Sequence, residues 1–142
     1  MDDSRKVNHE GIRKSMRSNR SRDTGPELLV RHALRSGGYP GYRLQWNVPG
    51  RPDIAYPGRK IAVFVNGCFW HRCPYCNPSF PATNIAFWEK KFADNAARDR
   101  RALKALREMG WATHVIWECQ LKPPDLQQTI RDLLNFVAAY ST

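Results

Sequence analysis

The sequence predicts one α/β domain in which a mixed central sheet is flanked by helices. Residues 61–65 form a short, uninterrupted apolar run rich in β-branched side chains, which is typical of a buried strand. Two segments, 24–36 and 84–109, instead carry apolar residues at helical spacing, and each is followed by glycine. A chain of 142 residues is long enough to enclose one hydrophobic core between such elements.

The first 23 residues differ from the rest because they are charged and poor in apolar side chains. We expect a basic N-terminal arm at 1–23 and a single domain at 24–142. The arm either becomes ordered on DNA or serves as a disordered, solubilising tail, and its composition leaves both interpretations open. Its candidate DNA-binding residues are Arg13, Lys14, Met16, Arg17 and Arg20.

The later elements can be placed from capping residues, turns and apolar spacing. Thr24 and Glu27 have capping-box spacing, so the first helix is expected to begin there. Glu27 needs no other role, since an acid in the first turn stabilises a helix by itself. The elements that follow are a strand at 42–48, a strand at 55–56, the buried strand at 61–65, the helix at 84–109, a strand at 113–117 and, after Pro123, an amphipathic helix.

The composition favours an intracellular protein that binds a polyanion. Lys and Arg total 23 against 13 Asp and Glu, which gives a formal net charge of +10. Nucleic acid is the default partner of such a chain, although a solvated basic surface or an acidic protein partner would also account for the charge. The polar opening residues have no signal-peptide pattern, and no apolar run approaches the ~20 residues of a membrane helix. We therefore expect a reducing, intracellular compartment.

The densest group of chemically active residues follows the buried strand directly. Residues 66–76 read Asn-Gly-Cys-Phe-Trp-His-Arg-Cys-Pro-Tyr-Cys. In a reducing compartment clustered cysteines favour a metal over disulfides, and four thiolates suffice for a closed, tetrahedral, structural Zn²⁺ site. Buried free thiols are the alternative. His71 is not needed as a ligand, and the candidate zinc ligands are Cys68, Cys73, Cys76 and Cys119.

A second pattern joins the first helix to the strands. Asp53 stands at the head of one strand, a second strand follows, and Glu27 lies on the preceding helix. This arrangement resembles the PD-(D/E)xK nuclease core, in which carboxylates hold Mg²⁺ against the scissile phosphate and the metal acidifies a bound water. The usual Glu-x-Lys is replaced by the apolar residues 63–65, so another group must activate the water. His71 lies nearby, and the pKa of histidine suits that task.

Several short motifs occur in order between residues 12 and 121 and together resemble the very short patch repair endonucleases. That family nicks DNA beside the thymine of a T:G mismatch. The resemblance implies a restriction-endonuclease-like fold with structural zinc, and Mg²⁺-dependent cleavage of one strand that leaves 5′-phosphate and 3′-hydroxyl ends. The motifs are Gly50-Arg51-Pro52-Asp53, Gly67-Cys68-Phe69-Trp70-His71, Pro81-Ala82-Thr83, Phe87-Trp88, Arg98-Asp99-Arg100-Arg101, Gly110-Trp111 and Trp117-Glu118-Cys119.

The resemblance also implies roles for individual residues. Asp53 would hold Mg²⁺ together with the main-chain carbonyl of Val65, His71 would be the catalytic histidine, and Glu27 and Asp99 would be supporting acids. The family pattern has threonine and histidine where this chain has Val65 and Asn66, so the second histidine is lost. The candidate catalytic residues are thus Glu27, Asp53, Asn66, His71 and Asp99.

Asp99 shares the apolar stripe of the long predicted helix with Phe92 and Leu103. A carboxylate that faces a core is costly unless a cation, hydrogen bonds or a metal site receives it, which favours an active-site role. An ion pair with a neighbouring arginine is the alternative.

Three aromatic residues lie near the cysteines. Phe69 and Trp70 are within the cysteine-rich segment 66–76, here called the cysteine loop, and Trp88 is near the start of the long helix. Such residues are most often part of a core. The resemblance instead makes them a wedge that enters the base stack beside the mismatch. A T:G wobble pair stacks and pairs less well than a matched pair, so it yields more cheaply to insertion.

The resemblance carries further expectations about biology. It implies a bacterial, cytoplasmic, nucleoid-associated monomer that acts on mismatched double-stranded DNA, with mismatch-repair helper proteins and a functional link to a cytosine methyltransferase. Two rivals stay open. One is a nicking endonuclease of restriction or defence that is indifferent to mismatches, and the other is a zinc-stabilised DNA-binding module without catalysis.

Overall fold

A computed structural model describes residues 24–140 of the chain. The predicted basic arm, with its candidate residues Arg13, Lys14, Met16, Arg17 and Arg20, lies outside the described residues. In the described part, no helix has the length and apolar character needed to cross a membrane.

The first described helix, α2 (Gly25–Ser36), begins as its capping residues predict. The Thr24 hydroxyl accepts a hydrogen bond from the Glu27 N–H at 3.3 Å, and the Glu27 carboxylate accepts one from the Thr24 N–H at 3.3 Å. Pro26 occupies the first turn, where its missing N–H costs no intrahelical bond. The helix ends at Gly37, and Gly38 takes a left-handed conformation with φ of 99°.

A four-stranded mixed sheet lies at the centre, in the order β1 (Arg43–Leu44), β2 (Ile54–Tyr56), β3 (Ile61–Asn66) and β4 (Ala112–Trp117). The first three strands are antiparallel, with a 3-10 turn, η1 (Pro57–Arg59), between β2 and β3. β3 and β4 are parallel, and the long helix α4 (Ile85–Glu108) forms the crossover between them. The predicted α/β class and buried strand are confirmed.

The strand expected at 42–48 is wrong, because only Arg43 and Leu44 pair with β2. Gln45 has a left-handed φ of 48°, which breaks the extended backbone. Immediately afterwards the Val48 N–H bonds to the Trp46 carbonyl at 2.9 Å. The chain therefore turns away from the sheet, and β1 is a short edge strand that offers little open backbone for further pairing.

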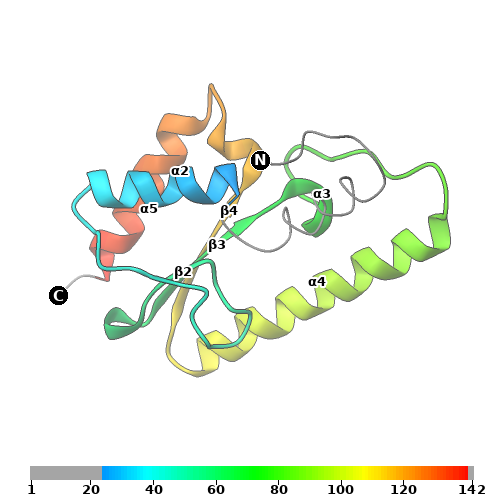
Figure 1. Cartoon of the computed structure of the whole chain (residues 1–142). Coiled ribbons are helices and arrows are strands. Elements are labelled where there is room, and N and C mark those ends of the chain that lie inside the picture. Colours follow the sequence, from blue (N-terminus) through cyan, green and yellow to red (C-terminus); the bar gives the residue numbers. More distant parts are fainter. Residues whose placement is uncertain (1–23, 141–142) are drawn as a thin grey trace.

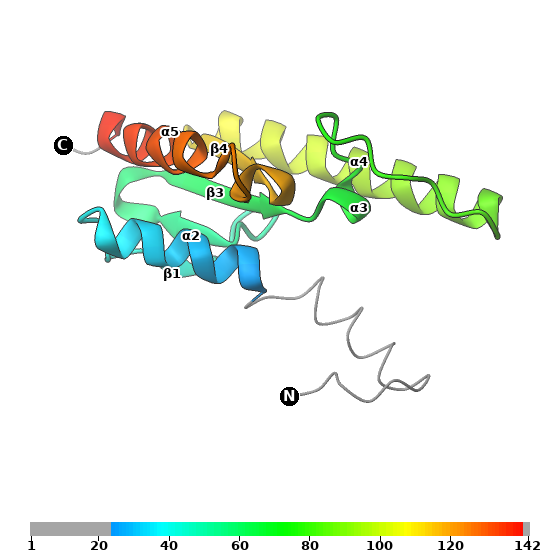
Figure 2. The same ribbon diagram turned by 90° about the horizontal axis from the view of Figure 1, so that it is seen from above.

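Helices cover both faces of the sheet (Figure 1). Ile54, Ile61 and Val63 point towards α2 and the last helix, α5 (Leu126–Ala139), whose Leu133 is fully buried against them. The alternate strand residues Ala55 and Ala62 point the other way, towards Leu106 of α4. Seen from above, α2 and α5 lie side by side on the same face of the sheet (Figure 2). The small alanine side chains let α4 approach the sheet closely.

α4 confirms the helix expected at 84–109 to within one residue at each end. At 24 residues it is about 36 Å long, so it outreaches a six-residue strand of roughly 20 Å. Its first half projects past the sheet, and a four-residue helix, α3 (Cys68–His71), packs beside that half (Figures 1 and 2). The parallel register pairs Asn66 with Trp117. The segments after β3 and β4, α3 and a 3-10 turn η2 (Glu118–Leu121), therefore start at the same edge of the sheet.

Candidate active site

A cleft of about 650 Å³ opens where α2 begins, β2 begins, β3 ends and α3 meets α4. Ligands commonly bind at such a sheet edge because several elements present side chains there at once. All five candidate catalytic residues line this one cleft, and so do Val65 and two of the three predicted wedge residues. The set is Glu27, Asp53, Val65, Asn66, Phe69, Trp70, His71 and Asp99.

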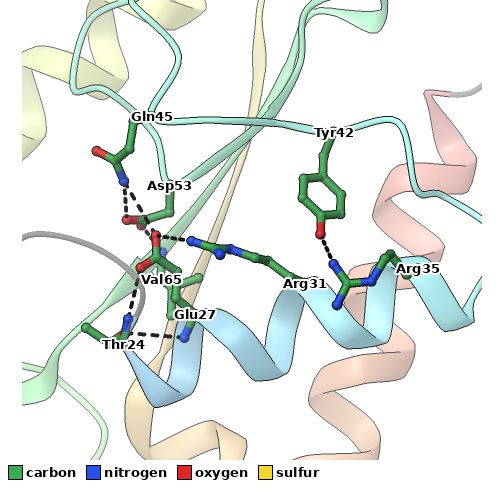
Figure 3. A network of polar contacts seen from close by, with 8 residues as sticks. All are labelled: Thr24, Glu27, Arg31, Arg35, Tyr42, Gln45, Asp53 and Val65. Atoms are coloured by element: carbon green, nitrogen blue, oxygen red, sulfur yellow. Dashed lines mark hydrogen bonds and ion pairs between the residues drawn. The ribbon is translucent and has the colours of Figure 1, made fainter. Parts of the chain in front are cut away.

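Two carboxylates, Asp53 and Glu27, meet on one side of the cleft (Figure 3). Asp53 Oδ2 accepts the Val65 N–H at 2.7 Å. The side-chain amide of Gln45 donates to Asp53 Oδ1 and to Glu27 Oε2, each at 3.4 Å, and so bridges the two acids. Glu27 is only 2% exposed, and the Arg31 guanidinium lies 3.8 Å from its Oε2. The pair is thus held rigidly from a helix, a strand and a loop.

The electrostatics of this pair favour a bound cation. Burial raises the pKa of Asp53 to about 7; the Val65 N–H opposes the shift, and the neighbouring Glu27 adds to it. A hard divalent cation prefers carboxylate and carbonyl oxygens, and it would offset the repulsion between the two acids. The carboxylates of Asp53 and Glu27 therefore form a donor set that fits Mg²⁺.

His71 and Asp99 meet on the other side of the cleft, where His71 Nδ1 lies 2.6 Å from Asp99 Oδ2. The expectation that Asp99 faces the core is wrong, because its side chain is 38% exposed and that of His71 is 29% exposed. Asp99 instead lines the cleft and contacts His71, the last residue of α3. A carboxylate at Nδ1 fixes the ring orientation and leaves Nε2 available to a substrate.

The four cysteines lie close together, and their sulfur atoms are all within 4.8 Å of one another. Tetrahedral zinc, with Zn–S bonds of about 2.3 Å, requires sulfur atoms about 3.8 Å apart. Cys73 Sγ and Cys119 Sγ are 3.7 Å apart, and none of the four is in a disulfide. The donor set and its spacing therefore fit a structural zinc ion.

Backbone amides reinforce this interpretation of the thiols. The Cys119 N–H donates to Cys68 Sγ and the Tyr75 N–H donates to Cys73 Sγ, both at 3.3 Å. Burial opposes ionisation of Cys73, but N–H donors from Cys76 and Tyr75 and the neighbouring thiols outweigh it and lower its pKa. Burial dominates at Cys119 and Cys68: it raises the pKa of Cys119 to about 11 and also raises that of Cys68. A cation among the sulfurs would reverse that balance, because metal binding deprotonates coordinating thiols.

The predicted wedge residues belong to a larger aromatic cluster that joins α3 to the first half of α4. The ring of Phe69 lies 5.1 Å from that of Trp70, 5.5 Å from that of Trp88 and 5.3 Å from that of Phe92. Phe92 is buried, whereas Phe69, Trp70 and Trp88 are partly exposed. The cluster is therefore anchored like a core on one side and open to solvent on the other.

Sequence reasoning missed two polar residues of the cleft. Gln45 gave no signal, because a glutamine in an apparent strand is ordinary. Asn95 could have been found, since it lies between Phe92 and Asp99 at helical spacing and is only 8% exposed. Its side-chain amide donates to the Trp70 carbonyl at 3.2 Å, and its carbonyl accepts from the Arg98 guanidinium at 3.0 Å. Asn95 thus ties the end of α3 to α4.

Comparison with known proteins identifies relatives along most of the chain. The sequence profile of the family described as DNA mismatch endonuclease Vsr matches residues 5–77. The chain is 37% identical over 121 residues to the type II nicking enzyme V.XorIIP of Xanthomonas oryzae pv. oryzae, a match that covers 84% of this chain and 89% of that protein.

Two further relatives have similar identities. The DNA mismatch endonuclease Vsr of Escherichia coli is 37% identical over 110 residues, which cover 77% of this chain and 70% of that protein. The type II nicking enzyme V.NaeI of Lentzea aerocolonigenes is 39% identical over 114 residues, which cover 76% of this chain and 68% of that protein.

Proposed function

We propose a substrate and a mechanism on the premise that this chain belongs to the DNA mismatch endonuclease Vsr family and is an endonuclease that nicks DNA. Family membership sets aside the rival of a zinc-stabilised DNA-binding module without catalysis. The proposed reaction is Mg²⁺-dependent hydrolysis of one strand beside the thymine of a T:G mismatch. One observation carries the proposal: a carboxylate pair and a histidine–carboxylate pair line the same cleft, beside partly exposed aromatic rings.

His71 is proposed to accept the proton of the attacking water. His71 Nδ1 lies 2.6 Å from Asp99 Oδ2, so Nε2 is the nitrogen that would accept the proton. Asp99 keeps the ring in one orientation and stabilises the imidazolium that forms as the proton is taken. Attack on phosphorus breaks its bond to the 3′ oxygen, which leaves a 5′-phosphate and a 3′-hydroxyl.

Asp53 and Glu27 are proposed to hold Mg²⁺, with the main-chain carbonyl of Val65 as a further ligand. When bound, Mg²⁺ supplies charge neutralisation at the scissile phosphate and acidifies water. Gln45 keeps the two carboxylates at fixed positions by donating to both. Asn66 lines the same cleft in place of the histidine that the family pattern has there, and its amide is available to a phosphate oxygen.

The four cysteines are proposed to bind a structural Zn²⁺ that fixes α3 and therefore His71. Cys68 begins α3 and His71 ends it, while Cys73 follows two residues later. The metal would thus hold α3 in place through a ligand at its start, Cys68, and a ligand just after its end, Cys73. Its role is positional, since four thiolates fill the coordination sphere.

Recognition of the mismatch is proposed to follow from insertion of Phe69, Trp70 and Trp88 into the base stack. The wobble pair is easier to unstack than a matched pair, so discrimination would come from the cost of deforming the DNA. Lys91 and Arg98 line the same cleft as Phe69 and Trp70, so we propose that they contact phosphates.

A nicking assay on two duplexes that differ only in a T:G or T:A pair tests the proposal. We expect Mg²⁺-dependent cleavage of the thymine strand that is much faster for the mismatched than for the matched duplex, and direct resealing of the nick by DNA ligase, which requires a 5′-phosphate. Asp53→Ala and His71→Ala should abolish nicking and leave DNA binding intact. His32→Ala and Asp132→Ala remove the same groups from exposed positions on α2 and α5 and serve as matched controls. Undiminished cleavage by Asp53→Ala or His71→Ala would reject the mechanism.

A second candidate is a nicking endonuclease, linked to restriction or defence, that does not require a mismatch. Two observations favour it: V.XorIIP and V.NaeI are named type II nicking enzymes, and Asn66 replaces the second histidine of the family pattern. Equal nicking of the T:G and T:A duplexes would select this function and reject the first.

The biological setting follows from the proposed substrate. T:G pairs arise when 5-methylcytosine loses its amino group, so we propose a functional link to a cytosine methyltransferase and to mismatch-repair helper proteins. A single-strand nick needs one active site, and a monomer suffices for it. We further propose that residues 1–23 act as a DNA-binding arm on a single domain at 24–142, and that the protein works on the nucleoid in the bacterial cytoplasm.

A further inference from the structure

Arg72 occupies an unusual position in the cysteine loop, directly after the candidate catalytic histidine. It is the residue after α3, and its backbone is left-handed, with φ of 53° and ψ of 70°. Residues with a Cβ atom rarely adopt this conformation, because it brings Cβ too close to the neighbouring carbonyl oxygen. After a turn at residues 74–76, the chain continues as a loop at residues 77–81 that has no regular secondary structure.

The guanidinium group of Arg72 binds three main-chain carbonyls. Nη2 donates to the Pro78 carbonyl at 2.8 Å, and Nη1 donates to the Phe69 and Ser79 carbonyls at 3.3 and 3.4 Å. One of these carbonyls is in α3 and the other two are in the loop. A planar group with several N–H donors can make such contacts at once, whereas a lysine ammonium on a flexible stem cannot reproduce their geometry.

The same guanidinium lies among three aromatic rings. It is 4.3 Å from the ring centre of Phe92 and 5.5 Å from those of Phe69 and Phe80. Phe92 is on α4, Phe69 is on α3 and Phe80 is in the loop, so one side chain contacts all three segments. Among residues 24–140, no carboxylate lies within 4.0 Å of Arg72. Its charge is therefore received by carbonyls and ring faces.

We propose that Arg72 is a positioning residue that orders the aromatic cluster and so determines how strongly the enzyme discriminates a mismatched from a matched duplex. The inference rests on the proposed function, in which Phe69, Trp70 and Trp88 enter the base stack. A wedge that is ordered before it meets DNA loses little conformational entropy on insertion. Insertion is slightly cheaper at a T:G pair than at a matched pair, and an ordered wedge turns that difference into a higher nicking rate on mismatched DNA.

The alternative is that Arg72 merely stabilises the loop. The two roles differ in what a lysine at this position would do. Lysine keeps the charge and much of the stem, so it preserves general stability, but it loses the planar contacts with the rings and carbonyls. A positioning role is therefore tested by Arg72→Lys rather than by Arg72→Ala. Arg131→Lys, on the exposed face of α5, is the matched control.

The first measurement uses the free protein and needs no substrate. In ¹⁵N–¹H spectra of the full chain, we expect the indole signals of Trp70 and Trp88 to shift and broaden in Arg72→Lys. The signals of Trp46 and Trp111, which lie outside the cluster, should keep their positions. Bound zinc per chain should be unchanged. Unaltered Trp70 and Trp88 signals would overturn the proposal whatever the enzyme cleaves.

The second measurement uses DNA with 2-aminopurine beside a T:G or a T:A pair. For the wild-type protein we expect a fluorescence rise at the mismatch, which reports unstacking. Arg72→Lys should reduce the T:G over T:A ratio of nicking rates about tenfold and diminish the fluorescence rise, while low-salt binding of the matched duplex stays unchanged.

A loss of zinc, or an equal loss of nicking on both duplexes in Arg72→Lys, would assign Arg72 a structural role and overturn the proposal. Wild-type protein that cuts both duplexes equally would instead overturn the mismatch function. The indole spectra would then still decide whether Arg72 orders the cluster.

Discussion

His71 Nδ1 and Asp99 Oδ2 are 2.6 Å apart although the two residues are 28 positions apart in sequence. The contact joins the last residue of α3 to the middle of α4, across the cleft wall that also carries Trp70. Because α4 is long and straight, its middle is a fixed point against which a four-residue helix can be oriented. The geometry of the candidate general base therefore depends on α4 as much as on its own loop.

Asp99→Asn should reduce the single-turnover nicking rate by on the order of 10²–10⁴-fold, because an amide can hold His71 in the wrong tautomer and cannot stabilise an imidazolium. Thermal stability should change little, since the Asp99 side chain is partly exposed. Asp94→Asn, on an exposed turn of the same helix, is the control. An Asp99→Asn protein with the wild-type rate would remove Asp99 from the mechanism.

Asp53→Asn should stabilise the protein at pH 8 in the absence of Mg²⁺. The folded pKa of Asp53, about 7, lies above its ordinary value of 3.8, so the folded state binds the proton more tightly. The stability that this proton provides is complete below pH 4 and is lost as the pH rises to about 7. Relative to wild type, Asp53→Asn should therefore gain on the order of 2–4 kcal/mol at pH 8 and almost nothing at pH 4.

Urea denaturation at both pH values measures this difference, with Asp132→Asn as an exposed control. Added Mg²⁺ should stabilise the wild type at pH 8 and leave Asp53→Asn unaffected, because the ligand is lost. A stability difference that does not vary with pH would show that burial does not raise the pKa of Asp53.

Removal of metal from the cysteine cluster should lower the unfolding temperature steeply. Purified protein is expected to hold one zinc ion and to expose none of its thiols to a thiol reagent. A strong chelator should release the zinc, make all four thiols reactive and abolish nicking, and added Zn²⁺ should reverse each change. Cys119→Ser should lose both zinc and stability, although it is distant in sequence from the other three. Full thiol reactivity before chelation would contradict the zinc site.

Gly50→Ala should destabilise the protein by about 2–4 kcal/mol, because two costs combine. Gly50 has a left-handed φ of 82°, and a Cβ atom there would lie 2.8 Å from the Ala102 Cβ and 3.2 Å from the Phe64 ring. Ala102 belongs to α4, and Phe64 belongs to β3 and packs against the buried cluster around Leu106, so neither can move away easily. Gly58→Ala is the matched control, since nothing lies within 4 Å of its added Cβ. Chemical denaturation of the two variants measures the difference.

Much of the fold could be predicted because local chemistry and tertiary structure agree. The capping box at Thr24, the apolar run of β3 and the helical stripe of α4 each depend on neighbours in sequence, and all three are confirmed. β1 could not be predicted, because its length is set by the left-handed backbone of Gln45. That conformation is stabilised by the contacts of the Gln45 side chain with Glu27 and Asp53, which are distant in sequence.

In the candidate site, too, some residues could be predicted from the local sequence and others depend on contacts between distant segments. Asp53, His71 and the cysteines could be selected from residue type and spacing, and the structure places them around one edge of the sheet. Their assigned roles stay predictions. Arg72 could not be selected, because a basic residue within a cysteine loop in a basic chain carries no signal of its own. Its contacts exist only once α3, α4 and the loop have been assembled.

The parallel pairing of β3 with β4 links metal binding to the correct register of the two strands. Cys68 follows β3 and Cys119 follows β4, so their sulfurs meet only when Asn66 stands opposite Trp117. A slip of one residue would displace one thiol by about 3.3 Å, more than a zinc–sulfur bond tolerates. With the proposed zinc ion, metal uptake would therefore distinguish correctly registered molecules from mispaired ones.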